Sequence, residues 1–198
     1  MIKIEYSADD ISYSIISQDA FNSRQLLEKH IDYINNIQNN ITYNSNNRIM
    51  SITTSGGGRL NLEQKYTYSQ DDPDRLTEYE YTLGSETKKY TYQYDQKDGA
   101  VYPDNRLIKL SLKNADSSLI FDNNLNYDLL GRIYSNNISG SNLNYTQTYT
   151  YLQGDFGGKI AQTKYIQSIK HNINGADRLN LSYTYDNNGN IISESRNG

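Results

Sequence analysis

The feature that most restricts the fold of this chain is an alternation of apolar and polar residues with a period of two. In the segment 60–69, mostly apolar and aromatic residues alternate with polar or charged ones. The first set is Leu60, Leu62, Gln64, Tyr66 and Tyr68, and the second is Asn61, Glu63, Lys65, Thr67 and Ser69. The segments 119–127, 143–151 and 179–185 follow the same pattern. Successive side chains of a strand point to opposite faces, so this period indicates strands with one apolar and one wet face.

A hairpin-sized repeat runs through the chain. Each copy has an alternating segment that ends in a tyrosine, a turn rich in Asp, Asn and Gly, and a closing residue, usually basic, followed by Leu or Ile. The tyrosine and the closing residue of each copy are Tyr43 and Arg48, Tyr68 and Arg75, Tyr94 and Arg106, Tyr127 and Arg132, Tyr151 and Lys159, Tyr185 and Asn190, with a weaker first copy from Tyr13 to Arg24. Successive closing positions are 24 to 31 residues apart, which is room for two strands and two turns. We therefore predict a single domain of β-hairpins over residues 1–198.

Composition favours the same fold class. The 198 residues include 20 Tyr and 25 Asn but only six Ala. Tyr favours strands and Asn favours turns, and the shortage of strong helix formers argues against a helical bundle. Residues 19–38 are the one helix candidate, yet the repeat spacing favours strands there too. We predict an all-β meander of twelve or more antiparallel strands, with little or no helix, curled into a barrel-like or spiral sheet that buries its apolar face.

Two copies of the repeat closely resemble the YD repeat of Rhs-type proteins, in which Tyr-Asp and two variable residues precede Gly-Arg, and a third copy keeps the Tyr-Asp pair. The residues that carry the resemblance are Tyr94 and Asp95; Tyr127, Asp128, Gly131 and Arg132; and Tyr185, Asp186 and Gly189. This family includes bacterial Rhs and wall-associated proteins, Tc-toxin shell components and animal teneurins. The resemblance implies a strip of hairpins that curls, in full-length relatives, into a hollow shell. With six or seven hairpins and no autocleavage segment, this chain is expected to be a short relative or a fragment.

No constellation in the sequence indicates catalysis, a cofactor or a metal. The absence of Cys excludes disulfides, thiol catalysis and cysteine zinc sites. His30 and His171 lie far apart, without carboxylates at ligand spacing. The glycines 56–58 are not followed by the Lys-Ser/Thr pair of a phosphate loop, and Glu78 and Glu80 alternate with tyrosines as residues of a wet strand face do. We expect a protein that is not an enzyme, with no cofactor, in which the motif residues have structural roles.

The tyrosines leave two functional alternatives. Because they share a face with Leu and Ile, most of them are expected to form the interior of a curved sheet. If they are exposed instead, their rings can stack on sugars. The first alternative predicts a non-catalytic structural repeat module of a bacterial surface or secreted protein, acting as a shell or scaffold segment or as an adhesive surface. The second predicts a carbohydrate-binding module.

Charge and hydropathy restrict the partners. The net charge of −4 gives no attraction to nucleic acid, and no run of 18 apolar residues indicates membrane insertion. The first residues read as a strand rather than as a signal peptide, so any export signal is expected to lie outside this chain. We expect an extracellular or cell-surface location, a glycan or protein partner there, and self-association through strand edges.

Overall fold

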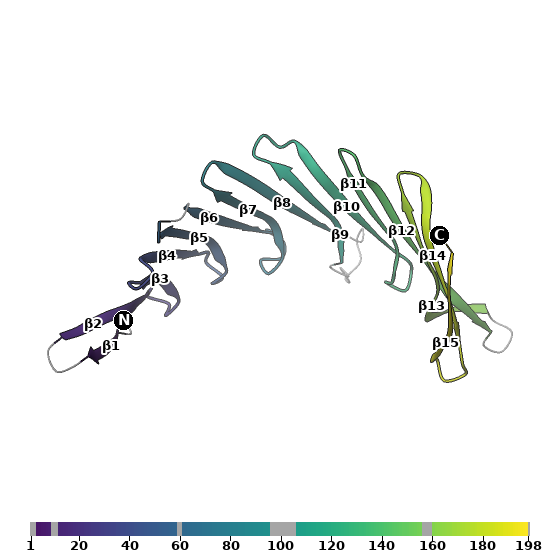
Figure 1. Cartoon of the computed structure of the whole chain (residues 1–198), viewed down its shortest axis with the longest axis horizontal. Coiled ribbons are helices and arrows are strands. Elements are labelled where there is room, and N and C mark those ends of the chain that lie inside the picture. The colour runs from purple at the N-terminus through teal and green to yellow at the C-terminus, as the bar shows by residue number, and fades with distance from the viewer. Residues whose placement is uncertain (1–2, 9–11, 59–60, 96–105, 156–159, 198) are drawn as a thin grey trace. The chain divides into compact units, whose positions relative to one another are not determined.

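A computed structural model describes residues 3–8, 12–58, 61–95, 106–155 and 160–197, and these residues form strands and turns without any helix (Figure 1). The strands are β1 (Lys3–Ala8), β2 (Ser12–Phe21), β3 (Leu27–Asp32), β4 (Ile37–Tyr43), β5 (Ile49–Gly56), β6 (Leu62–Tyr68), β7 (Leu76–Leu83), β8 (Glu86–Tyr94), β9 (Leu107–Asn114), β10 (Leu119–Tyr127), β11 (Ile133–Gly140), β12 (Asn144–Asp155), β13 (Ile160–Ile173), β14 (Ala176–Tyr185) and β15 (Ile191–Asn197). The prediction of an all-β meander of hairpins is therefore confirmed, and residues 19–38 lie in strands and the turns between them.

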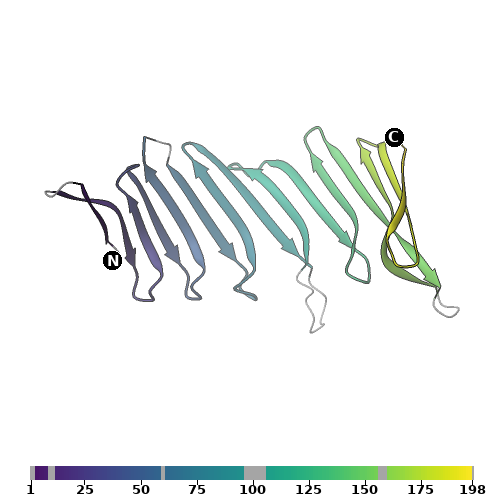
Figure 2. The ribbon, with the colours of Figure 1, turned by 60° about the horizontal axis from the view of Figure 1, so that its bottom comes forward.

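The strand order is the sequence order, from β1 to β15, so the described sheet is not closed into a barrel. The chain divides into two compact units. The first unit holds residues 1–92 and 113–118, and the second unit holds residues 93–112 and 119–198. Within each unit, the described turns that follow even-numbered strands lie at one end of the strands and those that follow odd-numbered strands lie at the other end (Figure 2).

In the first unit, the register separates a tyrosine face from a polar face. Tyr66 of β6 is opposite Tyr79 of β7, which is opposite Tyr90 of β8. Residues two places away along these strands share this side of the sheet, which we call the tyrosine face. The opposite, polar face carries Glu and Lys residues joined by ion pairs, for example Lys89 Nζ to Glu78 Oε1 at 3.0 Å.

The second unit repeats this division. Its tyrosine face carries cross-strand pairs such as Ile138 with Tyr145 and Tyr149 with Ile169. Its polar face carries rows of Asn, Ser and Thr, as in the row that joins Asn126, Ser135 and Thr148. The alternation in the sequence therefore assigns the faces correctly in both units.

The expectation that the apolar face is buried is wrong for the described residues. No apolar side chain among them is buried, and only Ser111 and Ser135 are. A single layer of strands places nothing over its tyrosine face, whereas a protein core needs two packed layers. The tyrosines are half-buried, because each ring is covered only by its neighbours on the same face.

Ring contacts on the tyrosine face give one test of this arrangement. The ring centre of Tyr79 lies 5.1 Å from that of Tyr66 and 5.9 Å from that of Tyr90. The hydroxyl of Tyr79 accepts a hydrogen bond from Gln64 Nε2 at 2.9 Å. We expect Tyr79→Ala to lower the free energy of unfolding by about 1–2 kcal/mol in urea titrations. Thr67→Ala, on the exposed polar face, should change it by less than about 0.5 kcal/mol. Equal effects of the two substitutions would contradict the assignment of the faces.

Candidate functional site

The turn that carries the Tyr-Asp motif is built by its aspartate and its glycine. The amide of Asp128 donates to the carbonyl of Arg132 at 2.9 Å, and the amide of Gly131 donates to the carbonyl of Asp128 at 3.0 Å. Asp128 Oδ1 accepts from the amides of Leu130 (2.9 Å) and Arg132 (3.0 Å). Gly131 has a φ of 79°, which favours a residue without Cβ. An acceptor side chain at the first position and Gly at the fourth therefore favour this turn.

Three other turns have the same hydrogen bonds with different residues. Asn22, Asn44 and Asp186 each donate from the amide to the carbonyl four residues later, at 2.9 Å. Their side-chain oxygens accept from the amides two and four residues later. The fourth position has positive φ in every case: Gln25 (61°), Asn47 (64°) and Gly189 (84°). Asn therefore replaces Asp at the first position, and Gln or Asn replaces Gly at the fourth.

A one-residue bulge follows each of these turns. Asn126 is opposite Ser135, but the next residue, Tyr127, is opposite Ile133, so Tyr134 is an extra residue. The same shift occurs where Phe21 faces Leu27, Tyr43 faces Ile49, Tyr68 faces Leu76 and Tyr185 faces Ile191. A bulge leaves one residue outside the regular pairing and increases the local twist. The bulge therefore has the same position relative to the turn in each of these repeats.

In five of the repeats, a tyrosine at or near the end of an even-numbered strand bonds to the preceding odd-numbered strand, a contact that we call the tyrosine latch. Its hydroxyl donates to the carbonyl of the first residue of that strand, Leu27, Ile49, Leu107 or Ile133, or to that of Ile166 within β13. The latches of the first unit are Tyr43 to Leu27 (2.8 Å) and Tyr68 to Ile49 (3.0 Å); those of the second are Tyr127 to Leu107 (2.9 Å), Tyr151 to Ile133 (2.7 Å) and Tyr185 to Ile166 (2.7 Å). Burial raises the pKa of the Tyr127 and Tyr151 hydroxyls further above neutral pH, where tyrosine is already protonated and can donate.

The closing arginines join one turn to the next. In the second unit, Arg132 Nε donates to Asp128 Oδ2 at 2.7 Å, its Nη1 donates to the carbonyl of Thr163, and its guanidinium lies 3.8 Å from the ring centre of Tyr151. Arg106 is similar, with a 2.7 Å bond to Asp95 and a position 4.8 Å from the ring centre of Tyr127. Each cation thus contacts its own carboxylate and the tyrosine of the following turn.

The first unit makes these links with other atoms. Arg48 Nε donates to Asp74 Oδ1 of the following turn at 2.7 Å, and Arg24 Nη1 donates to the carbonyl of Asn44 at 2.8 Å. Arg75 pairs with Asp72 of its own turn at 3.2 Å, and its side chain is only 14% exposed. Arginine is therefore used in both units to connect neighbouring turns.

The structure departs from the sequence analysis at the copy that contains Tyr151. Tyr151 is opposite Ile166, not residue 160, and the latch of Tyr185 also ends on Ile166. Tyr165 therefore occupies the closing position, directly before the residue that pairs with Tyr151 and accepts the latch of Tyr185. Its ring lies so close to Gly189 that a Cβ there would overlap it. Lys159, the predicted closing residue, lies outside the described residues.

The first copy also differs from its prediction. Phe21 takes the place of the tyrosine, Asn22 that of the aspartate and Leu26 that of the closing residue, while Arg24 lies inside the turn. The remaining predicted residue, Tyr94, ends β8 directly before Asp95, as Tyr127 ends β10 before Asp128. In both irregular copies the closing position directly precedes the residue that pairs with the tyrosine position: Leu26 precedes Leu27, and Tyr165 precedes Ile166.

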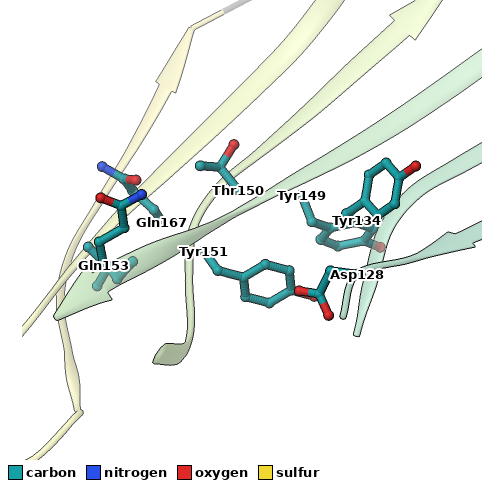
Figure 3. Close-up of a pocket in the computed structure, with 8 residues that line it drawn as sticks. Asp128, Tyr134, Tyr149, Thr150, Tyr151, Gln153 and Gln167 are labelled. Atoms are coloured by element: carbon teal, nitrogen blue, oxygen red, sulfur yellow. The ribbon is translucent and has the colours of Figure 1, made fainter. Parts of the chain in front are cut away.

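A hollow of about 460 Å³ lies beside this row of turns in the second unit. Figure 3 shows the side chains of Tyr134 and Tyr149 on one side of the hollow, Tyr151 extending toward Asp128, and the amides of Gln153 and Gln167 on the other side. Aromatic rings and amide groups together are the surface that sugars and polar peptides use.

Comparisons with known proteins give no identification: no protein-family model matches this chain, and no curated protein matches it. Over the described ranges, no group of three or more His, Cys, Asp or Glu residues is placed to hold a metal ion. The described residues also contain no helix long and apolar enough to cross a membrane.

The tyrosine latch can be tested by removing a single oxygen atom. We expect Tyr127→Phe to lower the free energy of unfolding by about 0.5–1.5 kcal/mol, because the half-buried carbonyl of Leu107 loses its donor. Tyr134→Phe is the matched control, because the structure assigns no hydrogen bond to the hydroxyl of this 45% exposed residue within the described ranges. Urea titration of both variants measures the difference, and a control as destabilised as Tyr127→Phe would contradict a role for the latch.

The charge of Asp128 predicts a dependence on pH. Burial acts to raise the pKa of this carboxyl, but hydrogen bonds from the side chain and amide of Arg132 outweigh burial and hold the pKa below its usual value of 3.8. A lowered folded-state pKa contributes stability above pH 3.8, and this contribution is lost as the pH falls through the folded-state value.

We therefore expect Asp128→Asn, which keeps the oxygen that Asn44 uses in its own turn, to be less stable than the wild type at pH 7. The difference in free energy of unfolding should shrink as the pH falls below 3.8, because both forms then lack the charge. Urea titrations at a series of pH values test this. A difference that stays constant down to pH 2 would show that Asp128 acts only through neutral hydrogen bonds.

Proposed function

We propose that this chain is a structural repeat module, a short relative or fragment of the YD-repeat type, within a bacterial surface or secreted protein. The observation that carries the proposal is the tyrosine latch, which recurs in both units and at five places ties a hairpin to the preceding one. The residues of the Tyr-Asp motif have their polar groups engaged with the backbone and with one another. They serve to hold the strip together and to present its two faces.

The division of the faces supports a scaffold or shell segment. The polar face carries ion pairs and rows of hydroxyl and amide side chains, which water solvates. The tyrosine face is half-buried and keeps large apolar groups available for a second layer. Such a sheet supplies a wall whose two sides differ in chemistry, which suits a segment that encloses or supports another structure.

A second candidate is carbohydrate binding at the hollow beside Tyr149. The observation that favours it is the combination of the Tyr134 and Tyr149 rings with the amides of Gln153 and Gln167 around one space. A sugar ring could stack on tyrosine there while amides bind its hydroxyls. This function would use a surface beside the latches and would not replace their structural role.

The proposed location predicts that an antibody raised against this chain labels intact cells of the organism that produces it. Labelling only after lysis would overturn a surface or secreted role, and antibody against a cytosolic protein is the control for cell integrity.

A glycan array, followed by calorimetry at millimolar sugar, separates the two candidates. The scaffold proposal alone predicts no hit. A hit that is lost in Tyr149→Ala but kept in Tyr66→Ala, a substitution on the tyrosine face of the first unit, would establish the second candidate.

A further inference from the structure

We propose that Tyr66 and Tyr79 are an oxidative cross-linking site, at which a peroxidase and hydrogen peroxide join the two rings by a carbon–carbon bond. The product is a dityrosine that links β6 to β7 within the first unit. This inference goes beyond the scaffold function and does not depend on the latches. It rests on the arrangement of the two rings and on the scarcity of other side chains that are readily oxidised.

The strand register brings Tyr66 and Tyr79 closer together than Tyr79 and Tyr90. The amide of Gly84 donates to the carbonyl of Asn61 at 3.1 Å, so these two residues form a hydrogen-bonded pair. Counting from this pair makes Tyr66 with Tyr79 a non-hydrogen-bonded pair, in which facing side chains lie closer. Tyr79 therefore directs its backbone groups toward β8, which makes Tyr79 with Tyr90 a hydrogen-bonded, wider pair. The ring-centre distances of 5.1 Å and 5.9 Å agree with this assignment.

One amide group holds the hydroxyl ends of both rings. Gln64 Nε2 donates to the hydroxyl oxygen of Tyr79 at 2.9 Å and to that of Tyr66 at 3.3 Å. The two rings therefore direct their hydroxyl ends to the same place, which brings together the Cε carbons beside those hydroxyls. These carbons share the unpaired electron of an oxidised phenol, so they are the atoms that couple.

The coupling reaction balances with peroxide as the oxidant. Each tyrosine hydroxyl gives one hydrogen atom to the peroxidase, which leaves a radical shared between the oxygen and the Cε carbons. The two radicals form a Cε–Cε bond, and the hydrogen on each of these carbons moves to the phenol oxygen, which restores both aromatic rings. Hydrogen peroxide takes up the two hydrogen atoms that the protein loses and is reduced to water.

The composition of the chain directs oxidation to tyrosine. Cys, Trp and Met are the side chains that compete with tyrosine for oxidants, and the sequence has no Cys, no Trp and only two Met against 20 Tyr. Tyr66 and Tyr79 are half-buried, and the described strands form a single sheet with no second layer over the tyrosine face. An oxidant in solution therefore has access to both rings.

Another pair of tyrosine rings is equally close but less suited to coupling. Tyr165 and Tyr185 have ring centres 5.1 Å apart, yet the hydroxyl of Tyr185 donates to the carbonyl of Ile166 at 2.7 Å. Removal of that hydrogen atom would break a latch. The five latches do not involve the hydroxyl of Tyr66 or Tyr79, so we expect coupling at this pair first.

Peptide mapping after oxidation tests the proposal. The folded chain is treated with a peroxidase and an equimolar amount of hydrogen peroxide at low protein concentration, and is then digested with trypsin. Cleavage after Lys65, Arg75 and Lys88 gives the peptides 66–75 and 76–88. The expected product joins these peptides through Tyr66 and Tyr79, with the fluorescence of dityrosine and a mass two hydrogen atoms below their sum. A product that joins 76–88 to 90–97 instead, products only between separate chains, or no coupling would overturn the proposal.

Phenylalanine variants make the result specific. Tyr66→Phe and Tyr79→Phe should each abolish the joined peptides, because phenylalanine has no hydroxyl hydrogen to lose. Tyr90→Phe removes the other tyrosine that faces Tyr79 and should form the joined peptides in the same yield as the wild type. Circular dichroism checks that every variant keeps its β structure. Joined peptides that persist in Tyr66→Phe, or that disappear in Tyr90→Phe, would contradict the assignment of the site.

Discussion

The hydrogen bond from a tyrosine hydroxyl to a backbone carbonyl of the preceding odd-numbered strand is the contact on which the rest of this structure depends. A sheet without a second layer gains little from apolar burial, since its rings are covered only from the side. Backbone pairing joins adjacent strands but does not fix where each hairpin ends relative to the one before. The latch fixes this at the ends of the strands, as Tyr151 does by reaching Ile133.

Tyrosine suits this position because its ring and its hydroxyl do different things. The ring of Tyr127 covers part of the tyrosine face and supports the guanidinium of Arg106, while the hydroxyl reaches a carbonyl on the neighbouring strand. Phenylalanine would supply only the first contact, and a shorter hydroxyl side chain lacks the ring. Five of the 20 tyrosines of the chain form latches, so this repeated need accounts for part of the high tyrosine content.

The period of two in the sequence was sufficient to predict the strands and to assign Tyr66 to an apolar face and Glu78 and Glu80 to a wet face, because side-chain alternation is a local property of a strand. The regular turns were also predictable, since Asp128 and Gly131 act within five residues of each other. What the sequence could not show was the partner across strands. Tyr165 replaces arginine through its contact with Gly189, and the latch joins residues 18 to 20 positions apart in the second unit. Burial was mispredicted because the sequence does not reveal whether a sheet acquires a second layer.

The hairpin of β12 and β13 shows that a pair of strands can extend beyond its latch. Past the pair of Tyr151 and Ile166, both strands continue to the pair of Asp155 and Ile160, yet the latches on Ile133 and Ile166 are kept. Whatever lies beyond the latch can therefore grow without disturbing the order of the hairpins. Evolution can lengthen the tip of one repeat, or accept an inserted segment there, while the neighbouring repeats keep their geometry. The same tip is the natural place at which to graft a foreign loop or epitope onto this chain.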